Sequence, residues 1–153
     1  MSPNPAADET APWQLSMRFS NRREELHRVI QTVEQLAEQL GLCPRDRFVL
    51  NLVVDEIATN AIEHAYPQGE AQDIELRVRI DAHQRLVIQL EDRGVEFNPL
   101  DRLPAPLDAP LEERDIGGLG IHLVRESVDD MAYERRGPAN CLTLVYTLTS
   151  ASA

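Results

Sequence analysis

The chain has 153 residues, enough for one domain with a hydrophobic core and a short tail. Hydrophobic residues make up 42% of the sequence and charged residues 27%, the composition of a globular protein and not of a disordered one. Because 26 acidic residues outnumber 15 Lys and Arg, the net charge is -11, which argues against direct binding to nucleic acid or to anionic membranes.

The sequence predicts one domain over residues 13–149, preceded by a disordered leader at residues 1–12. The leader, MSPNPAADETAP, lacks the basic start and apolar core of a signal peptide. No apolar run approaches the roughly 20 residues that a membrane-spanning helix needs, so we expect a cytoplasmic protein. Cys43 and Cys141 form no Cys-x-x-Cys or Cys/His pattern, which favours two core thiols over a disulfide or a zinc site.

The N-terminal part of the domain is predicted to contain one strand and two helices. Trp13 to Phe19 alternates apolar and polar residues, as a strand with one buried face does. Ser20 or Asn21 can then cap a first helix that stops at Gly41. Pro44 opens a second helix from about Arg45 to Tyr66. The first helix places its apolar residues three and four apart: Leu26, Val29, Ile30, Val33, Leu36, Ala37 and Leu40.

The C-terminal part is predicted to hold two antiparallel hairpins, a lid and a helix. Ile74 to Ile80 and Leu86 to Asp92 form the first hairpin. A connection rich in proline and glycine follows, and its length is typical of a functional lid, which we place at about residues 95–117. The segment GIHLVRESVDDM then reads as a helix, and AYERRG with CLTLVYTL forms the second hairpin. We expect four residues of that helix to face inward: Ile121, Leu123, Val124 and Val128.

This order of elements predicts the fold class α+β. Strands that pair as hairpins, with helices gathered on one face, give a two-layer α/β sandwich whose sheet is mixed and mainly antiparallel. A doubly wound sheet would instead alternate strands and helices along the whole chain.

A polar stripe is predicted on the second helix, within DEIATNAIEHAY. Glu56, Asn60 and His64 are four residues apart and therefore share one helix face. Asn is unfavourable inside a helix, which indicates a task for its amide. An amide oxygen is a hard ligand suited to Mg²⁺, and a carboxylate one turn earlier can accept a proton. The stretch alone is equally compatible with a solvated helix face beside the apolar stripe of Val53, Ile57 and Ala61.

Two further motifs carry chemistry that suits a nucleotide. In EDRGVEFNP, Asp92 ends a strand, where its carboxylate can accept a hydrogen bond from an exocyclic amine such as that of adenine. Gly94 lets a ring approach the backbone, although Asp-x-Gly is also common in plain turns. In DIGGLGIHLV, Gly117, Gly118 and Gly120 lead into a helix whose N–H groups can bind phosphate, unless this is only a loop-to-helix junction.

The order of these motifs is more specific than any one of them. The sequence shows Glu-x-x-x-Asn-x-x-x-His-Ala-Tyr, Asp-x-Gly-x-x-Phe-Asn-Pro, a proline-rich lid and Gly-Gly-Leu-Gly-Ile-His-Leu-Val. This series resembles the N box, G1 box and G2 box of the GHKL (Bergerat-fold) ATPase superfamily. Within it, the chain is similar to the anti-sigma-factor serine/threonine kinases of bacterial partner-switching systems. The resemblance covers roughly Trp13 to Leu148.

The resemblance implies a role for each motif residue in binding ATP with Mg²⁺. Asn60 would coordinate the Mg²⁺, Glu56 would be the general base for the attacking hydroxyl, and His64 would lie near the phosphates. Asp92 would bind the adenine amine, with Gly94 beside the ring.

The resemblance also assigns roles in the lid and the last strand. Gly118 and Gly120 would wrap the phosphates together with Gly117, and Arg114 matches a lid position that often contacts phosphate. Ala139 and Asn140 stand where the superfamily often has Gly-Thr, so Asn140 would contribute its amide to holding adenine in place of a hydroxyl.

The resemblance implies an ATP-dependent protein serine/threonine kinase. Its acceptor would be a Ser or Thr of a STAS-domain anti-anti-sigma antagonist, and it would sequester a sigma factor or a similar regulator, as a homodimer. The alternative is a non-catalytic, nucleotide-responsive module that only sequesters its partner, which has no need of the Glu56 carboxylate. An ATP-hydrolysing fragment of a larger machine is a further alternative, disfavoured because no transducer domain is present.

Overall fold

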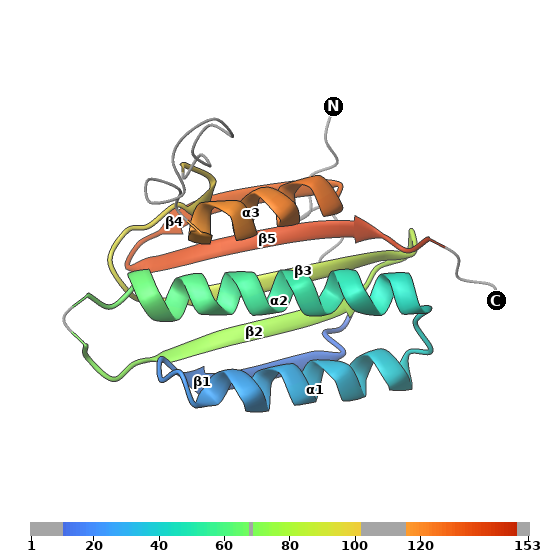
Figure 1. Ribbon diagram of the computed structural model, residues 1–153, viewed down its shortest axis with the longest axis horizontal. Coiled ribbons are helices and arrows are strands. Elements are labelled where there is room, and N and C mark those ends of the chain that lie inside the picture. Colours follow the sequence, from blue (N-terminus) through green and yellow to red (C-terminus); the bar gives the residue numbers. More distant parts are fainter. Residues whose placement is uncertain (1–10, 68, 102–115, 150–153) are drawn as a thin grey trace.

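The computed structural model describes residues 11–67, 69–101 and 116–149. Most of the predicted leader and lid, including Arg114, lie outside them. The elements in chain order are β1 (Leu15–Ser20), α1 (Glu25–Gln39), α2 (Pro44–His64), β2 (Asp73–Ile80), β3 (Arg85–Asp92), η1 (Pro99–Asp101), α3 (Ile116–Ser127), β4 (Asp130–Arg136) and β5 (Ala139–Thr147) (Figure 1).

The strands form a five-stranded sheet in the order β1-β2-β3-β5-β4. Every neighbouring pair of described strands is antiparallel. The prediction of a mixed sheet is therefore wrong for the described strands, and the prediction of mainly antiparallel pairing is right. The β2–β3 and β4–β5 hairpins are confirmed, and β3 pairs with β5 between them. This pairing places Asp92, at the end of β3, opposite Asn140, at the start of β5.

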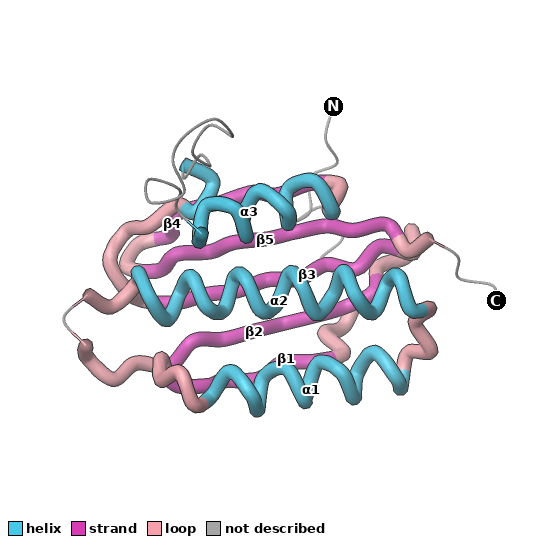
Figure 2. Tube along the Cα trace, in the orientation of Figure 1, coloured by secondary structure: helices cyan, strands magenta, loops and turns pink. Residues whose placement is uncertain are grey.

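The two-layer α+β architecture is confirmed, because α1, α2 and α3 all cover the same face of the sheet (Figure 2). The core lies between the layers and is built from the inward side chains of β2, β3 and β5 and the apolar faces of α1 and α2. Val53, Ile57 and Leu76 are among its buried members. Complete burial of such side chains stabilises a fold by about 1.5–3 kcal/mol each.

Helix α1 ends as predicted but begins differently. Gly41 has a φ of +65°, and its N–H bonds to the carbonyl of Glu38 while that of Leu42 bonds to Ala37, a Schellman stop. Neither Ser20 nor Asn21 caps the helix, because Arg22–Glu24 form an extra turn before Glu25. Asn21 instead bonds to Glu70 and Gln72, which lead into β2.

Helix α3 begins at Ile116, earlier than predicted, so Gly117, Gly118 and Gly120 lie inside it and not before it. Ile121 and Val124 are fully buried as expected, and Val128 packs against the core. Leu123 is 54% exposed, because the face that carries Ile121 and Val124 excludes it. The helix ends at Ser127, and Asp130 and Met131 already belong to β4.

A buried carboxylate fixes the start of α2 against the end of the chain. Asp46 accepts hydrogen bonds from the hydroxyls of Tyr146, at 2.7 Å, and Thr149, at 2.9 Å. Burial raises the pKa of Asp46, but these hydrogen bonds outweigh it and keep the pKa below its usual value. The contact holds α2 in one position over the sheet.

The prediction of two core thiols is right for Cys141, which is buried, and wrong for Cys43. Cys43 is only half-buried, because it precedes the first turn of α2, where its sulfur lies 3.3 Å from the hydroxyl of Thr149. Both cysteines are free thiols.

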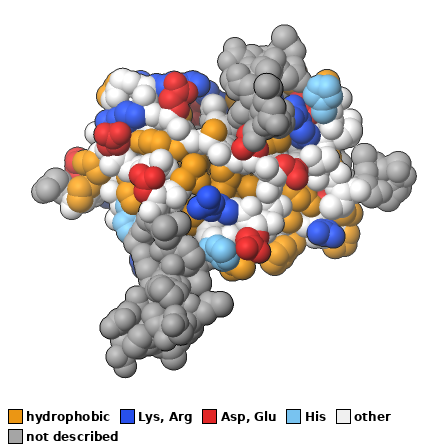
Figure 3. All heavy atoms as spheres, turned by 90° about the horizontal axis from the view of Figure 1, so that it is seen from above, with side chains coloured by type: hydrophobic (Ala, Val, Ile, Leu, Met, Phe, Trp, Pro, Cys, Tyr) orange, Lys and Arg blue, Asp and Glu red, His pale blue; other side chains and the backbone are white. Residues whose placement is uncertain are grey.

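The charged side chains on the surface are distributed as expected for a chain that does not bind nucleic acid directly. On the face seen from above, acidic and basic side chains are interspersed around a central apolar area (Figure 3). Nucleic-acid-binding faces gather basic residues in one patch, and the described residues of this face do not. In the described part of the chain, no helix has both the length and the apolarity to span a bilayer.

Candidate functional site

The polar stripe predicted on α2 is present. Glu56, Asn60 and His64 follow one another at one-turn intervals along the helix, and the neighbouring apolar stripe, with Ile57 and Ala61, is buried in the core. Asn60 is 5% exposed, whereas Glu56 and His64 are half-buried. The stripe therefore lies at the border of the core, where its side chains can face a ligand.

Glu56 meets the beginning of α3. A Cβ atom placed on Gly120 would lie 1.9 Å from the Oε2 atom of Glu56, so a side chain at this position would displace the Glu56 carboxylate. Burial raises the pKa of Glu56, and the neighbouring carboxylates of Asp55 and Glu63 raise it further. A carboxylate with a raised pKa is a stronger proton acceptor, which suits general-base catalysis.

The side-chain Nδ2 atom of Asn60 is buried and donates no hydrogen bond to any described residue. A buried amide is normally satisfied, and an exception in a cleft indicates that a ligand completes its bonding. An amide oxygen is also a suitable ligand for Mg²⁺. The observed side chain therefore fits the predicted metal-binding role.

The loop after β3 is fastened to the C-terminal end of α2. The N–H of Val95 donates to the carbonyl of Ala65 at 2.8 Å, and that of Arg93 donates to the hydroxyl of Tyr66 at 3.0 Å. These bonds satisfy a terminal carbonyl of α2 and bring Asp92 beside the last turns of the helix.

The structure requires glycine at position 94 for a reason that the sequence did not predict. A Cβ atom on Gly94 would lie 2.1 Å from the carbonyl oxygen of Ala65, so the close approach observed here is to the backbone of α2 and not to a ligand ring. The predicted contact with a base remains a prediction.

We expect Gly94→Ala to destabilise the domain, because neither backbone can move aside without breaking the bond between Val95 and Ala65. Crowding of this kind typically costs about 1–3 kcal/mol. Urea unfolding measures the loss, with the exposed neighbour Glu96→Ala as the control, for which a change within about 0.5 kcal/mol is expected. Equal midpoints for the two variants would contradict this explanation of Gly94.

Asp92 and Asn140 meet at the base of a pocket between the sheet and α2. The Nδ2 of Asn140 donates to the Oδ1 of Asp92 at 2.8 Å, and the N–H of Gly94 donates to the same oxygen at 2.9 Å. Burial raises the pKa of Asp92, while these two donors and the charge of Arg135 oppose the increase.

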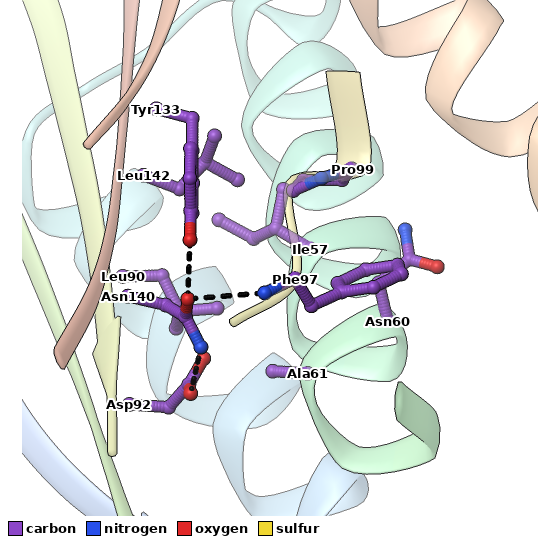
Figure 4. A pocket seen from close by; sticks show the side chains of 10 residues that line it. All are labelled: Ile57, Asn60, Ala61, Leu90, Asp92, Phe97, Pro99, Tyr133, Asn140 and Leu142. Carbon is purple, nitrogen blue, oxygen red and sulfur yellow. Dashed lines mark hydrogen bonds between the residues drawn. The ribbon is translucent and has the colours of Figure 1, made fainter. Parts of the chain in front are cut away.

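The pocket is narrow. Ten residues line it: Ile57, Asn60, Ala61, Leu90, Asp92, Phe97, Pro99, Tyr133, Asn140 and Leu142 (Figure 4). The space between them is about 20 Å³, enough for about one water molecule and not for a purine. Phe97 and Pro99 lie between the strands and α2 in this view. A base can therefore enter only when the segment that carries them moves aside.

Three residues of the site were missed by the sequence analysis. Phe97 lines the pocket and stacks on His64, with ring centroids 4.9 Å apart. Tyr133 and Arg135 reach Asn140 from the edge strand β4. The alternation of β4 could have indicated that Tyr133 and Arg135 point to the same face as Met131, but not that they meet Asn140.

The remaining predicted site residues are only partly placed. Gly117 and Gly118 lie in the first turns of α3, and Arg114 lies outside the described residues. Among the predicted residues, the structure brings Glu56 to Gly120, and it brings Asn60, Asp92 and Asn140 to one pocket.

Comparisons with known proteins identify the family of the chain. Residues 19–146 match the model of the histidine kinase-like ATPase domain. The serine/threonine-protein kinase BtrW of Bordetella bronchiseptica is 33% identical over 112 residues, which cover 73% of this chain and 78% of BtrW. The serine-protein kinase RsbW of Bacillus thuringiensis is 27% identical over 122 residues, covering 76% of this chain and 74% of RsbW.

Solved structures show the same fold at low sequence identity. The structure of the RsbU and RsbW domains of Rv1364c from Mycobacterium tuberculosis matches with a TM-score of 0.60 and 12% identity, over 88% of this chain and 33% of that one. The histidine kinase domain of a blue-light-activated kinase from Erythrobacter litoralis matches with a TM-score of 0.51 and 18% identity, over 82% of this chain and 60% of that one.

Proposed function

This chain belongs to the histidine kinase-like ATPase domain family, among its ATP-dependent serine/threonine protein kinases, and we propose that it phosphorylates a STAS-domain antagonist and sequesters a sigma factor or a similar regulator. The observation that carries the proposal is that Asn60 lines one pocket together with Asp92, while Glu56, one turn before Asn60, meets Gly120 of α3.

The geometry supports a direct transfer of the γ-phosphoryl group. A Ser or Thr oxygen of the acceptor attacks the γ-phosphorus of ATP, the bond from that phosphorus to the β–γ bridging oxygen breaks, and ADP leaves. The proton of the attacking hydroxyl goes to the carboxylate of Glu56. Asp92 orients the nucleotide by accepting a hydrogen bond from the adenine amine.

We propose that Asn60 holds the Mg²⁺ of the nucleotide. Bound there, Mg²⁺ supplies charge neutralisation to the phosphates. Among the described residues, no group of three His, Cys, Asp or Glu side chains could hold a metal ion without other ligands. Phosphate oxygens and water would therefore complete the coordination shell, as is usual for Mg²⁺.

The remaining proposals concern the lid, the partners and the location. Arg114, Gly117 and Gly118 would contact the phosphates, and residues 95–117 would act as the lid of a single domain at 13–149. The protein would work as a cytoplasmic homodimer, without contacting nucleic acid or a membrane. A non-catalytic module that sequesters its partner is the second candidate, favoured only by the narrowness of the pocket.

Calorimetric titration with ATP and with ADP, each with and without Mg²⁺, tests the nucleotide site. Transfer of label from [γ-³²P]ATP to candidate STAS-domain proteins then tests catalysis, with each candidate's serine and threonine positions replaced by alanine as the control. We expect Mg²⁺-dependent binding and labelling of one hydroxyl. Binding without transfer to any candidate would favour the sequestering module, and no binding by a folded sample would overturn the proposed site.

A further inference from the structure

A hydrogen-bond cluster behind the base pocket has no role in the proposed chemistry. It connects the edge strand β4 to β5 and to the loop after β3. Tyr133 and Arg135 lie on the same face of β4, two residues apart, and both reach the side chain of Asn140. Tyr133 also lines the pocket itself.

Every polar atom of the Asn140 amide has partners that fix its orientation. Its Nδ2 donates to Asp92 and to the carbonyl of Val95, each at 2.8 Å. Its Oδ1 accepts three hydrogen bonds, from the hydroxyl of Tyr133, the Nη1 of Arg135 at 3.1 Å and the N–H of Phe97 at 3.2 Å. An amide turned by 180° would bring its oxygen against two acceptors and its NH₂ group against the N–H donors of Arg135 and Phe97.

The fixed amide determines what Asp92 offers to a ligand. The Oδ1 of Asp92 already accepts from Asn140 and from Gly94, whereas its Oδ2 accepts no hydrogen bond from a described residue. Asp92 is 7% exposed, and burial raises its pKa, while the hydrogen bonds from Asn140 and Gly94 and the cation of Arg135 favour its ionised form. The pocket therefore presents an acceptor, which fits the amino group of a base and repels an oxo group.

We propose that Tyr133 and Arg135 are positioning residues that act through Asn140 to make the site select nucleotides whose base carries an amino group over those that carry an oxo group at the same position. This inference rests on the proposed function, since it concerns the same nucleotide site.

The physical reason is the loss of donors when these side chains are removed. Without the hydroxyl of Tyr133 and the guanidinium of Arg135, the Oδ1 of Asn140 retains only the N–H of Phe97, and the amide is held less firmly against Asp92. The weaker donation from Asn140 and the loss of the Arg135 cation both favour the protonated carboxyl of Asp92, whose proton can then lie on the Oδ2 atom that faces the ligand. A protonated carboxyl donates a hydrogen bond and so accepts an oxo base that the parent rejects.

The experiment compares ATP with ITP, which has an oxo group in place of the amino group of adenine. Calorimetry with Mg²⁺ gives the dissociation constants of both nucleotides for the parent, Tyr133→Phe, Arg135→Met and the double variant. We expect the parent to prefer ATP, and the double variant to lose about 10-fold or more of that preference. Arg136→Met is the control, because Arg136 is exposed and its guanidinium pairs with Glu134.

The pH dependence of ATP binding is a second readout. Asp92 must be ionised to accept from the amine, so binding is lost as the pH falls through its pKa. Removal of the Arg135 cation raises that pKa, and Arg135→Met should lose ATP binding at a higher pH than the parent does. Arg135→Lys keeps the cation and should restore the midpoint. The titratable groups around Asp92 are Glu91 on β3, Tyr66 after α2, Tyr133 and Arg135 on β4, and Cys141 on β5.

The outcomes separate this inference from the proposed function. A parent that prefers ATP, with variants that keep its preference and its pH midpoint, overturns the inference and leaves the site standing. Variants that bind ATP and ITP more weakly by the same factor also overturn it, since that result indicates a structural role. A parent that binds neither nucleotide overturns both. If the double variant fails to fold, Tyr133→Phe alone decides. A smaller preference for ATP over ITP would support the inference, and an unchanged ratio of the two dissociation constants would overturn it.

Discussion

Replacement of Glu56 by Gln is expected to leave the Mg²⁺-dependent binding of ATP close to that of the parent and to slow phosphotransfer by about 100- to 10,000-fold. Gln has nearly the shape of Glu, so it keeps the tight contact with Gly120. It cannot accept the proton of the attacking hydroxyl. Calorimetry measures the binding, and single-turnover transfer from labelled ATP to the acceptor protein measures the chemical step.

The same carboxylate predicts a pH dependence. Burial and the charges of Asp55 and Glu63 raise the pKa of Glu56, so the base is lost by protonation at a pH above the ordinary range of a Glu. The transfer rate of the parent should fall as the pH drops through this pKa. The transfer rate of Glu56→Gln should not show this fall at low pH. Equal transfer rates for the variant and the parent would remove Glu56 from the mechanism.

Glu63→Gln is the matched control on the same helix. Glu63 is exposed and pairs with Arg23 at 2.8 Å, whereas Glu56 is half-buried against Gly120. Replacement of Glu63 should leave the maximal rate unchanged. The loss of the Glu63 charge should also shift the fall of the transfer rate to slightly lower pH, because one of the charges that raise the pKa of Glu56 is gone.

The parts of the site that depend only on the repeat of the α-helix could be predicted from the sequence. Glu56, Asn60 and His64 share a face because residues four apart on any α-helix do, whatever the tertiary structure. The resemblance to the family was carried by motif order and is confirmed by the match over residues 19–146. The fold class followed from the order of hairpins and helices and is also confirmed.

The parts that depend on contacts between distant residues could not be predicted. The three glycines predict that the helix after the lid starts at Gly120 or later, since glycine weakens a helix interior by about 1 kcal/mol relative to alanine. Helix α3 nevertheless begins at Ile116, and Glu56 of α2 occupies the space that a side chain on Gly120 would need. A local propensity cannot include a neighbour that lies 64 positions away along the chain.

The cluster around Asn140 illustrates the same limit. Asn140 was predicted from its place in a motif, but its bonds to Asp92, Val95 and Phe97 depend on the register between β3 and β5. The sequence placed Tyr133 only in a strand of the second hairpin. The strand pairing, and not the strand pattern, makes it part of the site.

Asn60→Ala is expected to abolish the Mg²⁺-dependent part of ATP binding and, in the same protein, to maintain or increase the stability of the fold. The Nδ2 of Asn60 is buried without a partner, so its removal relieves an unsatisfied polar group. Alanine also has the higher helix propensity, by up to about 0.7 kcal/mol. A residue that is unfavourable for the fold and placed in a pocket is expected where function requires it.

Calorimetry with ATP in Mg²⁺ and in EDTA, together with urea unfolding without nucleotide, measures both effects. Asn51→Ala is the control, because it removes the same amide from the same helix outside the pocket, and its nucleotide binding should match that of the parent. If Asn60→Ala bound ATP with the parent's dependence on Mg²⁺, Asn60 would not be the metal ligand. If it also unfolded at lower urea than the parent, the amide would have a structural role, and the unpaired Nδ2 could no longer be explained by a ligand.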